Sequence, residues 1–250
     1  MGVPPPGLRR RLDAGERLLG VLLRLPSEDL LEMAAVSGFD FVLIDCEHGP
    51  ADVVELRRHV TVAQLHGLDV LVRTGSDEPA LVLRALDQGA AGVVAPHVDD
   101  PATAARLVDS VRYPPHGHRG FATYTRAGDF GRVPPEEHRA RAGQALVIGM
   151  IESPAGVRAV DDVLDVPGLD GLMVGGADLA ASRTETDPPL PECLDKVHRA
   201  VAAHGALRMD IVLTPEQASA SFEAGAQLVV YNIADVLMRH LAQLAAVRPG

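Results

Sequence analysis

The chain has 250 residues, of which 47% are hydrophobic, so it can bury a large core, and an α/β barrel commonly has this length as one domain. A formal net charge of -11 argues against nucleic acid or an anionic membrane surface as the main partner. Lys196 is the only lysine among the 23 basic residues, and it falls on a predicted outer helix, which argues against a Schiff-base enzyme.

The first residues predict a tail. Residues 1–16 are expected to form a flexible tail with a short helix, in which Pro4, Pro5 and Pro6 prevent regular structure, and residues 1–250 otherwise read as a single domain. No apolar run follows the early basic residues, and none approaches the roughly 20 residues of a membrane span. Cys46 and Cys193 form no CxxC pattern, so neither a disulfide framework nor a zinc site is indicated. A cytoplasmic enzyme is therefore expected.

From residue 18 onward, apolar runs of strand length alternate with segments that have the 3.6-residue apolar spacing of helices. The predicted strands cover 18–25, 39–49, 69–75, 91–98, 145–151, 169–176, 207–213 and 226–233. The predicted helices cover 27–38, 53–67, 78–89, 100–113, 156–166, 193–205, 215–225 and 234–247. Near-continuous apolar strands with helical crossovers favour a parallel sheet, and eight such pairs predict a closed (β/α)8 TIM barrel. An open doubly wound sheet is the alternative, although neither GxGxxG nor GxxxxGK[ST] is present.

One connection, residues 114–143, is too polar and too rich in Gly and Pro for a core segment, and it is longer than ordinary loops. Such loops often carry function, so we expect this one to act as an active-site lid.

Two predicted strands end in a carboxylate, Glu152 after ALVIGMI and Asp178 after LDGLMVGG. In α/β proteins ligands bind at the carboxyl ends of parallel strands. Two hard oxygen ligands there suit an octahedral divalent cation whose shell is completed by substrate and water. The alternative is that both acids are helix caps or solvated loop charges.

Other strand ends carry further polar residues, namely Asp45, Glu47, His48, Arg73 and His97. A metal ion and Arg73 together could hold a 2-oxo acid and neutralise the enolate formed from it. A histidine can take and give a proton near neutral pH, so His48 is the candidate proton shuttle, oriented by an acid such as Asp45. Structural roles for His48 and Arg73 stay open, whereas Cys46 is read as a small packed residue.

Several motifs together resemble the HpcH/HpaI aldolase family, metal-dependent pyruvate aldolases of the phosphoenolpyruvate/pyruvate superfamily. They are FDFVLIDCEHGP, LVRTGSDEPALVLRALDQGAAGVVAPHV, VRYPPHGHRGF, MIESPAGV and VGGADLA, in one order within residues 16–247. The resemblance implies a (β/α)8 barrel and a homo-oligomer, a hexamer or trimer of dimers whose last helix is often exchanged between subunits. It also implies Mg²⁺, Mn²⁺ or Co²⁺ on Glu152 and Asp178.

Further roles follow from the same resemblance. Arg73 is expected to stabilise the pyruvate enolate, and His48 to be the acid/base, supported by Asp45 and by Asp87 acting at a subunit boundary. Substrate binding is expected at Gly176 and Ala177, and Arg119 in GHRG is expected either to contact a distal carboxylate or to position the lid.

The expected reaction is aldol cleavage or formation of a 4-hydroxy-2-oxo acid through a pyruvate enolate, with 2-oxo acid and aldehyde as small-molecule partners. Two departures leave alternatives open: Met150 stands where the family usually has Gln, and Gly176 where it usually has Pro. The alternatives are a decarboxylase of an oxaloacetate-like acid, a diverted carbon-carbon bond-forming enzyme of specialised metabolism, and a catalytically silent metabolite-binding barrel.

Overall fold

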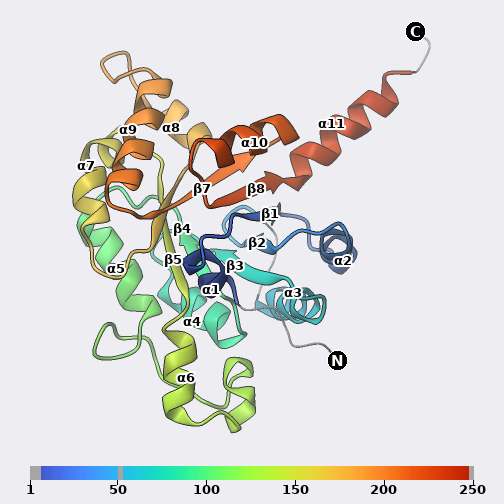
Figure 1. The fold of residues 1–250 in the computed structure, drawn as a ribbon, viewed down its shortest axis with the longest axis vertical. Helices are drawn as coiled ribbons and strands as arrows, with labels where there is room; N and C mark the ends of the chain where they lie inside the picture. Colours follow the sequence, from blue (N-terminus) through green and yellow to red (C-terminus); the bar gives the residue numbers. More distant parts are fainter. Residues whose placement is uncertain (1–6, 50–52, 248–250) are drawn as a thin grey trace.

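The described residues of the computed structural model, 7–49 and 53–247, form a closed barrel of parallel strands in the order β1 to β8 (Figure 1). The barrel closes because β8 pairs with β1, with Leu228 opposite Leu18. The predicted (β/α)8 architecture is therefore confirmed. The strands are β1 (Leu18–Leu23), β2 (Phe41–Asp45), β3 (Asp69–Arg73), β4 (Gly92–Ala95), β5 (Leu146–Ile151), β6 (Gly171–Val174), β7 (Leu207–Val212) and β8 (Leu228–Asn232).

Each strand is followed by a covering helix, and shorter helices occupy two of the connections and the start of the described chain. The covering helices are α2 (Glu28–Val36), α3 (Val53–Leu65), α4 (Pro79–Asp87), α5 (Pro101–Val111), α7 (Pro154–Leu164), α9 (Leu190–Ala203), α10 (Pro215–Glu223) and α11 (Ile233–Ala245). The others are α1 (Leu8–Asp13), the 3-10 helix η1 (Arg126–Gly131), α6 (Pro135–Ala142) and α8 (Gly176–Ser182).

Local sequence fixes where several covering helices begin. Asp100, Ser153 and Thr214 each accept a hydrogen bond from the backbone N–H three residues further on, and a proline follows each of them. The side-chain oxygen satisfies an N–H that has no partner inside the helix, and the proline has no N–H to satisfy. These starts therefore place the βα loops that hold the site.

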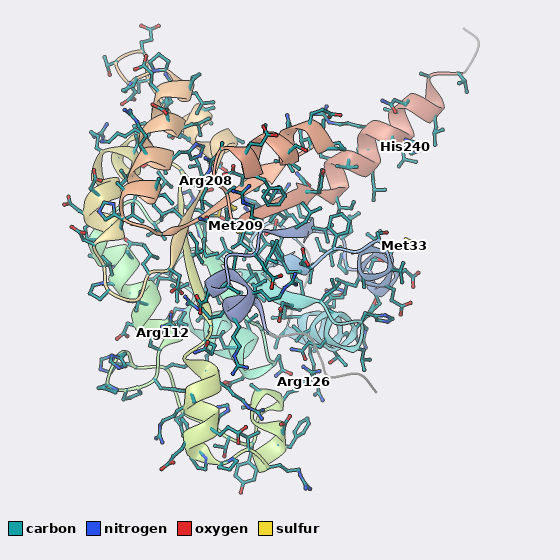
Figure 2. The ribbon with its side chains drawn as sticks, viewed as in Figure 1. Met33, Arg112, Arg126, Arg208, Met209 and His240 are labelled. Carbon is teal, nitrogen blue, oxygen red and sulfur yellow. The ribbon has the colours of Figure 1, made fainter. Side chains whose placement is uncertain are left out.

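The interior of the barrel is filled by alternate residues of the strands. Leu22, Leu43, Leu71 and Ile148 belong to one buried cluster, which also contains Met209, labelled at β7 in Figure 2. Because side chains alternate across a strand, the intervening residues face the helices and form separate clusters with them. The barrel is thus a packed core, and chemistry is confined to its ends.

Residues 8–13 pack against the barrel, whereas the sequence predicted a short helix within a flexible tail. These residues form α1, whose Leu8 and Leu12 are buried in the interior cluster. Arg9 and Arg11 tie the helix to the strand starts through salt bridges of 2.6 Å to Asp170 and 2.6 Å to Asp40. Residues 1–6, where the prolines lie, are outside the described residues.

The long connection 114–143 does not cover the carboxyl ends of the strands, so it is not a lid over the site of its own chain, as the sequence had suggested. It contains η1 and α6, and it joins the end of α5 to the start of β5. A helix-to-strand connection in a barrel lies at the amino-terminal ends of the strands, which is the opposite end from Glu152.

The last helix, α11, leaves the barrel and projects outward, carrying His240 with it (Figures 1 and 2). None of its residues is buried, and Met238, Leu241 and Leu244 are exposed. Among the described residues, no helix combines the length and the apolar character needed to cross a bilayer.

Candidate active site

Asp45 is the centre of the polar layer at the carboxyl end of the barrel. It ends β2 directly opposite Arg73 of β3, and both side chains are buried. Arg73 donates from Nε to Asp45 Oδ1 at 2.9 Å and from Nη2 to Oδ2, while Arg24 donates from Nε to Oδ2 at 2.8 Å. Burial by itself would raise the pKa of Asp45, but the bonds and charge of Arg73, aided by Arg24 and a backbone amide, hold it below its usual value.

His48 lies on the loop that Asp45 organises. The backbone amides of Glu47 and His48 donate to Asp45 Oδ1 at 3.2 and 3.1 Å. The His48 ring is 56% exposed, and its Nε2 lies 3.8 Å from Glu47 Oε2. Asp45 therefore holds His48 through the backbone amide, whereas the sequence suggested a contact that orients the imidazole.

Glu152 follows β5 and is buried at the same end of the barrel. Its Oε2 accepts a hydrogen bond from the His97 backbone N–H at 2.9 Å. Burial raises the pKa of Glu152; the amide and charge of His97 counter this rise, and the negative charges of Glu47 and Asp178 add to it. A Cβ at Gly175 would come within 2.2 Å of Glu152 Oε1, so the absence of a side chain at Gly175 gives this carboxylate its room.

Asp178 lies in the first turn of α8, after Gly176 and Ala177. The structure thus shortens the predicted strand, which ends at Val174, and moves Asp178 onto a helix start. Asp178 and Ala177 are exposed, and a Cβ at Gly176 would meet nothing within 4 Å. These three residues line an open side of the site.

The acidic residues fit a divalent cation. The charge of Asp178 adds to the raised pKa of Glu152, and Glu47 Oε2 is buried without a hydrogen-bond partner in the described chain, with Arg73 Nε at 3.4 Å. Within residues 7–49 and 53–247, no three His, Cys, Asp or Glu side chains form a preassembled metal site. Glu152 and Asp178 would instead be two protein ligands of an octahedral cation, with substrate and water as its other ligands.

Glu47 and His97 are the residues to which sequence reasoning assigned no role. His97 has a backbone φ of 52°, in the left-handed region, and this conformation aims its N–H at Glu152. Its Nδ1 lies 3.5 Å from Glu152 Oε2. Both residues stand at strand ends in the sequence, but nothing in the sequence shows which strand-end residues face the carboxylate.

Asp87 and Arg119 are not brought to this site within one chain. Asp87 is the last residue of α4, just before the start of β4, and therefore lies at the amino-terminal end of the barrel. Arg119 Nη2 donates to Asp87 Oδ1 at 2.7 Å, and its guanidinium lies 4.7 Å from the centre of the Tyr113 ring. Contact between Arg119 and a substrate held by Glu152 of the same chain is therefore excluded.

A cavity of about 690 Å³ is also at this amino-terminal end. It lies between α1, η1 and α6, and its lining includes Arg119 and Arg126. Figure 2 labels Arg126, whose Nη1 donates to the Gln88 carbonyl at 2.9 Å. Because the strand-end carboxylates lie at the opposite end, size alone does not identify the reaction site here.

Met150 and Cys46 are packed beside the site. Met150 is buried in the interior cluster, two residues before Glu152, so an apolar side chain lies below the carboxylate. Burial, with the charges of Asp45 and Glu78, raises the pKa of Cys46 to about 12. A thiol in that state is a poor nucleophile, in agreement with the reading of Cys46 as a packed residue.

Comparison with known proteins gives a consistent result. A pyruvate aldolase from Rhizobium etli is 34% identical over 223 residues, which cover 88% of this chain and 87% of that protein. A 2-keto-3-deoxy-L-rhamnonate aldolase from Escherichia coli K12 is 30% identical, covering 97% of this chain and 94% of that protein.

A solved structure from Burkholderia cenocepacia, described as an HpcH/HpaI aldolase/citrate lyase family protein, superposes with a TM-score of 0.87. It is 33% identical and covers 97% of this chain and 99% of that one. The family model for HpcH/HpaI aldolase/citrate lyase matches residues 19–237. The chain therefore belongs to the HpcH/HpaI aldolase/citrate lyase family.

Proposed function

We propose that this protein is a divalent-metal-dependent aldolase that cleaves or forms a 4-hydroxy-2-oxo acid through the enolate of pyruvate. The observation that carries the proposal is the convergence of Glu152, Asp178 and Arg73 at the carboxyl end of one barrel. The carboxylates of Glu152 and Asp178 lie there with the buried guanidinium of Arg73, which Asp45 holds in place. Family membership supports the same chemistry.

Glu152 and Asp178 would hold the metal ion, which we propose to be Mg²⁺, Mn²⁺ or Co²⁺. When bound, such an ion supplies a Lewis acid for the carboxylate and keto oxygens of a 2-oxo acid. Gly176 and Ala177, on the same helix start as Asp178, would border the bound acid. The space at Gly176 leaves room for it.

Arg73 would stabilise the negative charge on the enolate oxygen. Burial would lower the pKa of Arg73, but the bond and charge of Asp45, with the charges of Glu47 and Glu152, raise it. The guanidinium therefore stays charged throughout the reaction. Because Asp45 fixes its Nε and Nη2, the cation is positioned before substrate binds, which is the condition for electrostatic catalysis.

His48 would move the proton. In the cleavage direction its exposed ring takes the proton of the C4 hydroxyl as the C3–C4 bond breaks. The bonding electron pair passes into the pyruvate enolate, the C4 half leaves as an aldehyde, and the enolate is then protonated at C3. Asp45 supports the step by fixing the backbone of His48.

The working form would be a homo-oligomer, a hexamer or trimer of dimers. The exposed apolar residues of α11 support packing against a second copy of the chain. Asp87 and Arg119, which lie away from the strand-end carboxylates of their own chain, would serve the site of a neighbouring subunit. We place the enzyme in the cytoplasm, since both of its cysteines are free thiols.

The test is pyruvate release from a panel of 4-hydroxy-2-oxo acids and oxaloacetate, with each metal ion and after EDTA. We expect metal-dependent release from a hydroxy-oxo acid, lost in Glu152→Gln and in His48→Ala. Release from oxaloacetate alone would reassign the enzyme as a decarboxylase. No release from any substrate and no bound metal would leave a catalytically silent barrel. The apolar Met150 beneath the site is the reason to include this outcome.

A further inference from the structure

A second arginine, Arg24, stands in the same polar layer as Arg73. It directly follows β1, whose Leu22 faces the barrel interior. Residues two apart on a strand share a face, so Arg24 has the direction of Leu22, as Arg73 has that of Leu71. The register aligns β1 with β2 and β2 with β3, which sets Arg24 and Arg73 on either side of Asp45.

The contacts of Arg24 confirm this placement. Its Nε donates to Asp45 Oδ2 at 2.8 Å, and the same oxygen accepts the Nη2 bond of Arg73. The carboxylate of Asp45 thus lies between two guanidinium groups, and Arg73 has a second acidic neighbour in Glu47, whose Oε2 lies 3.4 Å from Arg73 Nε. Within the described residues, the Nη1 and Nη2 atoms of Arg24 have no hydrogen-bond partner.

Arg24 and Arg73 differ in exposure. The Arg24 side chain is 35% exposed, whereas that of Arg73 is 4% exposed. Arg24 therefore keeps its outer Nη edge open to solvent at the mouth of the barrel. That edge presents two parallel N–H groups, the geometry that binds a planar carboxylate in a bidentate manner. A single cation suits a monoanion.

The position of Arg24 determines whether it can reach the pyruvate half or the aldehyde half of the substrate. Glu152 and Asp178 lie at the ends of β5 and β6, and Arg73 on β3 lies between them and Arg24 in the strand order. His48, which would take the proton of the C4 hydroxyl, lies on the same side of the barrel as Arg24, because Asp45 accepts hydrogen bonds from the His48 backbone amide and from Arg24 Nε. We therefore infer that a substituent on C4 comes within reach of Arg24.

We propose that Arg24 binds a carboxylate on the aldehyde half of the substrate, so that the enzyme prefers 4-hydroxy-2-oxo diacids and aldehydes that carry a carboxylate. The inference rests on the proposed aldolase function and adds the substrate class. It makes Arg24 a specificity-determining residue, in addition to its bond with Asp45.

The experiment compares matched acceptor aldehydes in the synthesis direction, with pyruvate and a saturating divalent metal ion. The pairs are glyoxylate with glycolaldehyde and succinic semialdehyde with butanal, in which the first member carries a carboxylate and the second does not. The readout is the ratio of kcat/KM between the members of a pair. Any loss that a variant causes through Asp45 affects both members and cancels in this ratio.

We expect the ratio to favour the anionic aldehyde in at least one pair and to fall about 10-fold to 100-fold in Arg24→Gln, the range for a hydrogen-bonded charge. Arg24→Lys keeps the charge but loses the planar fork of N–H donors, so its ratio should lie between those of the wild type and Arg24→Gln. Arg199→Gln is the control, because Arg199 is exposed on α9 and, among the described residues, pairs only with Asp195 of the same helix. Its ratio should equal that of the wild type.

A ratio unchanged in both Arg24 variants would overturn the inference. Exchange of the C3 hydrogens of pyruvate in D₂O, followed by NMR, tests enolate formation without any acceptor. Exchange in the wild type with an unchanged ratio would refute the role of Arg24 and leave the aldolase function standing. Absence of both exchange and aldol product would refute the proposed function and the inference together.

Discussion

At the scale of single residues, Asp45 links more of the candidate site than any other side chain described. It receives both arginines of the polar layer and two amides of the loop that carries His48. A buried carboxylate with this many charged and polar donors fixes their geometry before substrate arrives. Loss of its charge would leave the buried Arg73 with a more distant acidic partner, Glu47, whose Oε2 lies 3.4 Å from Arg73 Nε.

Asp45→Asn is therefore expected to lower the free energy of unfolding at pH 7 by about 3 kcal/mol or more, as for a broken buried ion pair. Because the folded protein holds the pKa of Asp45 below its unfolded value, its contribution is present above that value and is lost as pH falls through the folded pKa. The difference between variant and wild type should thus shrink in acid. Urea unfolding at pH 7 and near pH 3 measures it.

Asp195→Asn is the matched control, since Asp195 is exposed on α9 and pairs only with Arg199 there. This variant should change the unfolding free energy by less than about 1 kcal/mol at either pH. An Asp45→Asn protein as stable as the control would show that Arg73 finds another counter-ion.

Glu152 has the opposite electrostatic character. Burial and the nearby acids raise its pKa, so ionised Glu152 destabilises the metal-free protein as pH rises above the unfolded value. Glu152→Gln keeps the shape and removes the charge. We expect the metal-free variant to melt at or above the wild-type temperature at pH 7.

Metal should separate the two proteins further. Saturating Mg²⁺ or Mn²⁺ should stabilise the wild type by about 2.7 kcal/mol at 100 times the dissociation constant, and the variant far less. Activity should fall by about two to three orders of magnitude in the variant. Thermal melts with and without EDTA measure the first effect, and a wild type that does not respond to any divalent ion would contradict the metal assignment.

At the scale of elements, the sequence predicted all of the barrel strands and their covering helices. Apolar runs of strand length alternate along the chain with segments that have the 3.6-residue apolar spacing of helices. It missed how α1 would pack. Leu8 and Leu12 are two apolar residues among arginines, and they are buried only because the end of the barrel packs against them. Such tertiary burial leaves little local signal.

The long connection shows a different kind of error. Its length suggested a lid, yet its place in the chain, after α5 and before β5, already fixes it at the amino-terminal end. In the same way, strand-end reasoning found Asp45, Arg73 and Glu152, which the fold brings to one end. It could not find the His97 amide, since that contact depends on a left-handed backbone.

The exposed apolar residues of α11 lead to a prediction about assembly. Leu241 and Leu244 lie on a helix with no buried residue, so we expect them to pack against a second copy of the chain. Leu241→Glu combined with Leu244→Glu should dissociate the oligomer, as measured by light scattering after gel filtration. Gln243→Glu, which adds a charge to the same helix, is the control and should leave the mass unchanged.

At the scale of the whole molecule, the two ends of the barrel carry different parts of the predicted machinery. The metal-binding acids and Arg73 lie at the carboxyl end, while the Arg119–Asp87 pair lies at the amino-terminal end. Within one chain, the Arg119–Asp87 pair cannot reach the metal-binding acids, because the packed interior of the barrel lies between the two ends. A second subunit can, if its amino-terminal end meets the first subunit's site.

Mixing inactive variants tests that arrangement. We expect Glu152→Gln and Asp87→Asn each to be nearly inactive alone, and a co-expressed mixture to regain about a quarter of wild-type activity. The fraction follows because half of the sites have an intact Glu152 and, independently, half have an intact Asp87 from the neighbouring subunit. Activity per site in the mixture is the measurement.

Glu152→Gln mixed with Arg73→Lys is the matched control. Both residues lie in the same site of one chain, so every subunit of this mixture carries a defective site and no activity should return. Native mass spectrometry establishes that the subunits have mixed in both experiments. If mixed oligomers of Glu152→Gln and Asp87→Asn stay inactive, Asp87 does not serve a neighbouring site, and the pair with Arg119 is a structural salt bridge.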